Sequence, residues 1–536
     1  MQPPFFSLGS VDMKRLFYGG RILTLASPLY AEAMLVEDGR ILRTGEYSSL
    51  CEGLEGEVQK IDLGGRVIMP SFIDAHGHYN SIATSTLDCS VRGACSIEEI
   101  KARVDAYIKK RSIGAGEWVR VRDYDENRLP GALHPTLCEL DYICPDRPMR
   151  IAHASGHSTL YNSRALEIAG IDDATPSPDG GEICKSDGHV CGYMLESACR
   201  LVNRHIPAPS REELRGAFIE AQRTYAAYGI TTVQDGYLTR QNLEDYLEAD
   251  KDGKLKLDII GYIPIGAYKR LRDEFSDKLG KHVKIGGIKT FADGSPQLRT
   301  AWVGEPYLEG GNGIPNRSDE EMRRGMMMAA EESAQVLCHA NGDAAIEQFL
   351  RALEKAEETH PDYALTRPVI VHGQLMRRDQ LPIAKRLGAV VSFFVAHTYH
   401  WADVHIKNLG RARGMAISPV RSALGEGVHV TFHQDPPVIL PDMLETLWCA
   451  TCRVTRSGVV LEGEEISMLD AIRSVTIEAA YQYHEEDIKG TLEEGKYADF
   501  IILDRDPLEI PKEDIRNAHI LATYKEGECV YESNEW

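Results

Sequence analysis

The sequence predicts an α/β protein: a (β/α)₈ (TIM) barrel with a small β-sandwich domain formed by both termini and an insertion after the first barrel strand. Short apolar runs alternate with amphipathic stretches through the middle of the chain. Both ends carry strand-like runs, and the segment after the first apolar run is too long for one loop. The 536 residues, 43% of them hydrophobic, are enough for a large core.

The terminal segments predict one composite β domain. Residues 14–68 contain short alternating runs separated by Gly, Asp and Ser, such as residues 33–36. The same pattern returns near the end of the chain, at residues 499–504 and 520–524. We therefore expect residues 1–68 and 489–536 to form the β domain and residues 69–488 to form the barrel.

Eight apolar runs predict the barrel strands, and helix-like segments fill most of the gaps between them. The interval 80–209 carries its own helices and turns, and we expect it to be an insertion that closes over the catalytic face. The predicted strands are residues 67–74, 229–235, 255–265, 283–292, 334–339, 368–372, 389–396 and 429–432, and the helices include 211–228, 318–334, 344–358 and 467–483.

Composition excludes several functional classes. With 60 Lys and Arg against 81 Asp and Glu, the net charge of −21 argues against binding to nucleic acid or to an anionic membrane. No run of 18 apolar residues predicts a membrane span. The first ten residues lack the features of a secretory signal, so we expect a cytoplasmic protein with a small-molecule substrate. A homodimer would suit a chain of this size, although no segment indicates an interface.

Histidines and one aspartate follow the predicted strands. His76 and His78 come directly after the first strand, where residues i and i+2 project to one side and can share a metal ion. His339, His372 and Asp435 follow three later strands. Each alone could be an interior histidine or a turn-forming aspartate. Because barrel enzymes place their sites at the C-terminal strand ends, we expect these side chains to converge.

Lys289 lies in an otherwise apolar strand. A buried lysine must lower its pKa, pair with an anion or change chemically. A neutral amine can add carbon dioxide and become a carbamate, which is an anionic ligand able to bridge two divalent ions. The alternative is an ordinary ion pair with Asp293 or Glu196.

This ordered set of residues resembles the metal-dependent amidohydrolase superfamily. The run 490–504 resembles the superfamily signature where the chain re-enters the small β domain. Residues 289–295, 339–346 and 156–166 resemble the branch that contains N-substituted formamide deformylase. Two departures stand out: Ser71 replaces the usual Gly, and His433-Gln434 precedes Asp435 where the branch commonly has Gly-Ser.

The resemblance implies a metal site and a reaction. His76 and His78 would bind one divalent ion, most simply zinc, His339 and His372 a second, and carboxylated Lys289 both, with Asp435 at the metal-bound water as catalytic base. A one-ion site with Lys289 as an amine, and Glu196 as the next anionic candidate, is the alternative. The implied reaction is hydrolysis of a C–N amide bond in an N-acyl or N-formyl amine or a cyclic amide.

Other readings stay open. The same metal site could serve a deaminase, an esterase or a peptidase, and the barrel could be a non-catalytic binding or regulatory protein. Candidate substrate-binding residues are fewer and less specific, because each could also be structural. They are His153, His157 and Glu196 in the insertion and His397 after the seventh strand.

Overall fold

The computed structural model describes residues 14–536 except 53, 55, 154–157 and 535. The chain divides into two compact units, residues 1–82 with 219–536 and residues 83–218. The domain boundaries expected from the sequence stay a prediction.

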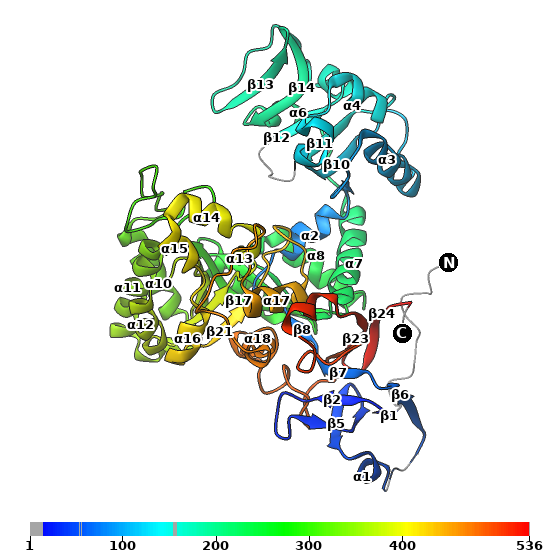
Figure 1. The fold of residues 1–536 in the computed structure, drawn as a ribbon, viewed down its shortest axis with the longest axis vertical. Helices are drawn as coiled ribbons and strands as arrows, with labels where there is room; N and C mark the ends of the chain where they lie inside the picture. The colour runs from blue at the N-terminus through cyan, green and yellow to red at the C-terminus, as the bar shows by residue number, and fades with distance from the viewer. Residues whose placement is uncertain (1–13, 53, 55, 154–157, 535) are drawn as a thin grey trace. The chain divides into compact units, whose positions relative to one another are not determined.

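An eight-stranded parallel sheet forms the centre of the first unit (Figure 1). Each strand is a short apolar run that is buried along most of its length, as expected for a parallel sheet covered by helices. In pairing order the strands are β21 (Val430–Phe432), β20 (Val390–Phe393), β19 (Val369–His372), β18 (Val336–Ala340), β17 (Val283–Phe291), β16 (Asp258–Pro264), β15 (Ile230–Asp235) and β8 (Phe72–Ile73). All eight predicted runs contribute to this sheet, so the α/β fold is confirmed.

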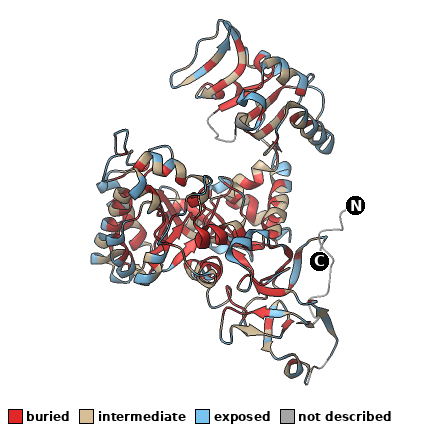
Figure 2. Cartoon of the chain, viewed as in Figure 1, coloured by how far each residue is buried: buried red, intermediate tan, exposed pale blue. Residues whose placement is uncertain are grey.

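The sheet curls so that the C-terminal ends of its two outermost strands meet. His76 follows β8 and His433 follows β21, and their ring centroids lie 5.2 Å apart. Buried residues follow the strands, while the helices on the outside present exposed faces to solvent (Figure 2). These helices include α8 (Arg240–Lys251), α10 (Asp319–Glu331), α11 (Asp343–Thr359), α12 (Leu381–Arg386), α16 (Val420–Glu426) and α17 (Met443–Cys452).

The first predicted strand divides between two sheets. Val67–Pro70 forms β7 in a terminal sheet, and only Phe72–Ile73 pairs in the central sheet. Between them, the Ser71 hydroxyl lies 2.6 Å from that of Thr231 in β15. One continuous apolar run therefore joins the terminal sheet to the site-bearing sheet.

The predicted helix 467–483 is broken. It forms α18 (Met468–Ser474) and α19 (Ile477–Gln482). The Val475 carbonyl accepts a hydrogen bond of 2.9 Å from the backbone N–H of Ile73 in β8. Amphipathic periodicity carries no sign of this long-range contact, which explains why the sequence predicts one helix.

Both chain ends build two terminal sheets of the first unit. Their facing residues, such as Phe17, Ile68, Phe500 and Leu521, share one hydrophobic cluster. The predicted β-sandwich stays a prediction. One sheet has the order β5 (Arg40–Gly45), β4 (Ala33–Glu37), β1 (Lys14–Tyr18), β6 (Val58–Asp62), and the other β24 (Glu528–Glu532), β23 (Ile520–Lys525), β22 (Phe500–Leu503), β7, β2 (Arg21–Leu23), β3 (Tyr30–Ala31).

The second unit has its own sheet and its own core. Helices such as α3 (Ile97–Arg111) and α4 (Leu137–Ile143) pack on it, and Val104, Val121, Leu140 and Ile151 are among the buried residues of this core. The sequence predicted the helices but not the sheet, which has the order β13 (Gly181–Ser186), β14 (His189–Glu196), β12 (Ser158–Tyr161), β11 (Met149–His153), β10 (Val119–Tyr124), β9 (Cys89–Ser90).

Two helices carry the chain between the units, α2 (Tyr79–Ser85) outward and α7 (Arg211–Ala227) back. On the side of the first unit, the buried rings of Tyr79 and Tyr225 lie 5.8 Å apart. Across the part of the chain that the structure describes, no helix is both long and apolar enough to cross a membrane.

Candidate metal centre

His76 is held in one tautomer at the end of β8. The side-chain N–H groups of Gln234 donate to the Ala75 carbonyl and the Tyr483 hydroxyl, so its oxygen is left to face His76 Nδ1 at 2.5 Å. Nδ1 therefore carries the proton, and the lone pair on Nε2 points inward. Lys289 Nζ, from β17, lies 3.1 Å from this Nε2 atom.

Three imidazoles face the carboxylate of Asp435, which follows β21. The Nε2 atoms of His78 and His76 lie 3.3 Å and 3.7 Å from its Oδ1 atom. His372 Nε2 lies 3.9 Å from its Oδ2 atom. His76, His372 and Asp435 each offer a ligand atom within 4.8 Å of the others. Residues that follow the two outermost strands of the curled sheet, β8 and β21, thus place metal-ligand atoms close together around one point.

His339 and His372 face each other beside this point. His339 Nδ1 lies 3.0 Å from His372 Nε2. His339 Nε2 lies 3.0 Å from the Gly294 carbonyl oxygen and 3.1 Å from Asn341 Nδ2. The tautomer with its proton on Nε2 donates to this carbonyl and leaves the Nδ1 lone pair facing His372. The neighbouring loop is held by Asp293, which accepts backbone N–H bonds from Trp302, Asn341 and Gly342.

Burial sets the charge states of the cluster. It lowers the pKa of His339 to about 4, and it lowers the pKa values of His76 and His372 well below their usual range. Burial also lowers the pKa of Lys289 to about 8. Although burial alone would raise the pKa of Asp435, the hydrogen bond from His78 and the nearby imidazoles hold it well below its usual range.

The donor set fits a divalent metal ion. Metal ligands must be deprotonated, and the neutral imidazoles of His76, His339 and His372 offer lone pairs at neutral pH beside an ionised carboxylate. Nitrogen ligands suit zinc, whereas oxygen ligands alone would favour magnesium or calcium.

Residues 59–531 match the amidohydrolase family. The chain belongs to this family. It is 28% identical over 526 residues to N-substituted formamide deformylase from Arthrobacter pascens, a match that covers 94% of this chain and 95% of that protein. It is also 28% identical over 536 residues to Protein LONG AFTER FAR-RED 3 from Arabidopsis thaliana, covering 96% and 91%.

A solved structure supports the same assignment. An uncharacterised metal-dependent hydrolase from Pyrococcus furiosus matches with a TM-score of 0.74 and 25% identity, covering 92% of this chain and all of that one. The family and this neighbour support a hydrolase.

The amidohydrolase brings six of the predicted site residues together: His76, His78, Lys289, His339, His372 and Asp435. The two alternative partners of Lys289 lie in different units. Asp293, in the first unit, accepts backbone N–H bonds, and among the described residues it forms no ion pair with Lys289. Glu196 is exposed at the end of β14 in the second unit, and its pairing with Lys289 stays a prediction.

The predicted substrate-binding residues are divided between the two units. His397 is buried in the first unit between Phe394 and Trp401, at ring-centroid distances of 4.7 Å and 4.5 Å, and its Nδ1 atom lies 3.0 Å from His405 Nε2. His153 lies in the second unit, with its Nε2 atom 2.6 Å from Glu126 Oε2. His157 falls outside the described residues. Contacts of these residues with a substrate stay predictions.

Sequence reasoning missed two contributors to the cluster. Gln234 orients His76, and the ring of His433 packs against His76 and His372 with centroid distances of 5.2 Å and 5.0 Å. A polar residue at the end of the apolar strand β15 could have indicated the first. His433 could be noticed only as a departure from the usual motif.

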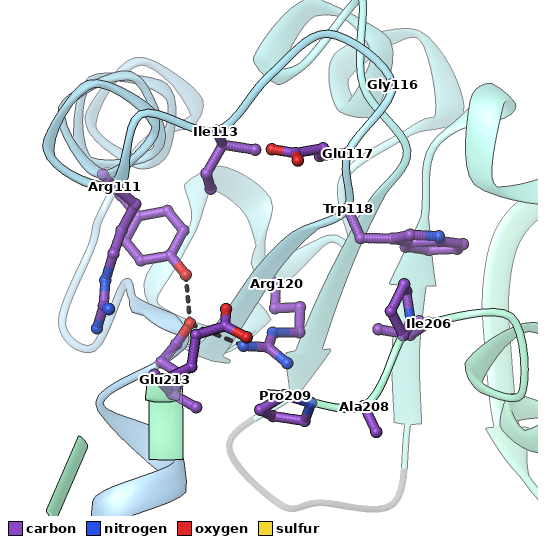
Figure 3. A pocket seen from close by; sticks show the side chains of 13 residues that line it. Arg111, Ile113, Gly116, Glu117, Trp118, Arg120, Ile206, Ala208, Pro209 and Glu213 are labelled. Carbon is purple, nitrogen blue, oxygen red and sulfur yellow. Dashed lines mark hydrogen bonds between the residues drawn. The ribbon is translucent and has the colours of Figure 1, made fainter. Parts of the chain in front are cut away.

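The second unit contains a separate pocket of about 480 Å³ (Figure 3). Trp118 and Pro209 line it with Arg111, Arg120 and Glu213. Arg120 is already paired with Asp88 at 3.1 Å, and the two arginines and two glutamates of the lining balance in charge. None of the predicted site residues lines this pocket.

Proposed function

We propose that this amidohydrolase uses a divalent metal, most simply zinc, to hydrolyse the C–N bond of an amide. The substrate class is an N-acyl or N-formyl amine or a cyclic amide. The observation that carries the proposal is the convergence of three strand-end imidazoles on Asp435, with Lys289 beside His76 and a fourth imidazole, His339, beside His372. The similarity to N-substituted formamide deformylase favours the formyl amines within this class.

The resemblance to the amidohydrolase superfamily implies which residues would hold the metal. His76 and His78 would bind one ion, and His339 and His372 a second. Lys289 would join them as a carbamate, since its lowered pKa leaves part of the amine neutral and able to add carbon dioxide. When bound, the ions would supply Lewis acidity and an activated water.

Asp435 would move the proton. Its carboxylate is ionised at neutral pH and lies among the imidazoles, so an Oδ atom can accept a proton from the attacking water. The same oxygen can then protonate the departing nitrogen, which turns a poor amide leaving group into a neutral amine. His76 and His339 do not compete for this proton, because burial keeps both imidazoles neutral.

The test is release of a free amine by the zinc-loaded protein. The purified chain, depleted of metal with a chelator and reloaded with zinc, is assayed on matched N-formyl, N-acetyl and cyclic amides, on the corresponding esters and on aminopurines. We expect amine release from at least one amide and none from the chelated protein. Amine release from no amide by zinc-saturated protein would refute the proposal, and ammonia from an aminopurine would indicate a deaminase.

A further inference from the structure

His433 lies where it can control one of the imidazoles of the centre. It is fully buried, and its Nε2 atom lies 3.0 Å from His372 Nδ1. Its other nitrogen, Nδ1, lies 2.9 Å from the hydroxyl of Ser392 in β20. Both ring nitrogens are therefore engaged. His433 faces the side of His372 that points away from Asp435, so it is not a further ligand.

The direction of the proton in this chain of contacts decides whether His372 can bind a metal. If His372 carries its proton on Nδ1, that N–H donates to His433, and the Nε2 lone pair faces the centre. If the proton sits on Nε2 instead, it points toward His339 Nδ1 and Asp435, and no lone pair is available there. Metal-binding histidines are usually oriented by such a partner on the second nitrogen.

We propose that His433 is a positioning residue that holds His372 in the metal-binding tautomer by accepting its Nδ1 proton. Ser392 completes the arrangement, because its oxygen accepts the N–H on His433 Nδ1 and leaves the Nε2 lone pair for His372. This role rests on the proposed metal centre.

Two variants of similar volume separate hydrogen bonding from packing. In His433→Gln the side-chain oxygen can replace Nε2 as the acceptor, whereas His433→Leu fills the space without one. We expect His433→Leu to weaken zinc binding by about 10- to 100-fold, the usual loss when such a partner is removed, and His433→Gln to stay close to the parent. His429→Gln is the control, because His429 pairs with Glu478 at the protein surface.

The measurement is the zinc dissociation constant of the metal-free protein in competition with a coloured chelator, with metal-free folding checked by circular dichroism. Equal zinc affinity in the parent and His433→Leu, or equal losses in the Leu and Gln variants, would overturn the inference. If His433→Leu does not fold, Ser392→Ala replaces it and should weaken zinc binding in the same direction; unchanged affinity there would also overturn it. No substrate is involved, so a protein that binds zinc as expected but cleaves no amide would contradict only the proposed function.

Discussion

Asp435 lies half-buried among imidazoles, and although burial alone would raise its pKa, the hydrogen bond from His78 and the nearby imidazoles hold it well below its usual range. Asp435→Asn removes the proton acceptor but keeps the shape of the side chain and all four imidazoles. We expect kcat to fall by about 10²- to 10⁴-fold, the usual contribution of a positioned base. Asp514→Asn on the exposed surface is the control. Activity within error of the parent, at equal zinc content, would exclude Asp435 as the base.

Lys289 makes the centre sensitive to pH and to carbon dioxide. Burial lowers the pKa of Lys289 to about 8, so the fraction of Lys289 in the neutral form increases as the pH rises from 7 to 9. Only this neutral amine can form a carbamate. Zinc reloading of the metal-free protein should therefore be faster with added bicarbonate, and the gain should be larger at pH 8.5 than at pH 7. Lys289→Met should abolish the bicarbonate effect. Full activity with full zinc content in Lys289→Met would rule out a required carbamate.

Much of the candidate site could be predicted at the residue scale, because short motifs at the strand ends indicate most of its residues. His76 and His78 lie two residues apart after an apolar run, and the ends of parallel strands meet at one edge of a sheet. The contacts of His433 could not be predicted, because its hydrogen bond to His372 joins residues 61 positions apart. Gln234 orients His76 across 158 positions for the same reason.

At the scale of the element, β17 places Lys289 through a close approach of two strands. A Cβ atom on Gly287 would lie 2.2 Å from the carbonyl oxygen of Gln335, which precedes β18. Gly287→Ala should therefore push the strands apart and lower the free energy of unfolding by about 1–3 kcal/mol, as overpacking usually does. Urea unfolding of the metal-free protein measures this loss.

The control for Gly287→Ala is a glycine with open space around it. Gly216 lies within α7, and a Cβ atom there meets nothing within 4 Å. Gly216→Ala should be neutral or stabilising by up to about 1 kcal/mol, because alanine favours a helix. If both substitutions had the same effect, crowding against Gln335 would not be the cause.

The elements themselves were predictable where side-chain patterns decide them. Apolar runs identified all eight central strands, because strands of a covered parallel sheet are buried on both faces. The break between α18 and α19 was not predictable, since the contact from Ile73 to Val475 crosses most of the chain. The sheet of the second unit was also missed, although the alternation Val119-Arg120-Val121-Arg122 in β10 is typical of a half-buried strand.

Across the whole of the first unit, buried charges join the central sheet to the C-terminal strands. Asp258 of β16 accepts from Lys489 Nζ at 2.6 Å and pairs with Lys525 of β23 at 3.0 Å. Lys525 also pairs with Asp499 at 2.9 Å. Asp258→Asn leaves two buried ammonium groups short of a partner, so we expect a loss of about 3–5 kcal/mol in the free energy of unfolding, measured by urea unfolding at pH 7. A loss below about 1 kcal/mol would show that Glu485 and Asp499, the other carboxylates paired with Lys489 and Lys525, are enough to stabilise the two ammonium groups.

The same cluster predicts how stability depends on pH. Burial alone would raise the pKa of Asp258, but Lys489 and Lys525 outweigh it and hold the pKa well below its usual range. A carboxylate with a depressed pKa stabilises the fold fully above its unfolded value of about 4, and the stabilisation is lost as the pH falls through the folded pKa. The parent should therefore lose stability faster than Asp258→Asn when the pH falls below 4.

The contact between Tyr79 of α2 and Tyr225 of α7 has a consequence for the exchange of the inserted residues 83–218 during evolution. The outgoing helix α2 and the returning helix α7 are in contact at Tyr79 and Tyr225. The chain therefore leaves the first unit for residues 83–218 and returns to it at neighbouring points. A different insertion could connect the same two helices. None of the central strands that precede the histidines of the centre lies within residues 83–218. Replacing residues 83–218 would therefore leave the sequence of all eight strands of the central sheet unchanged.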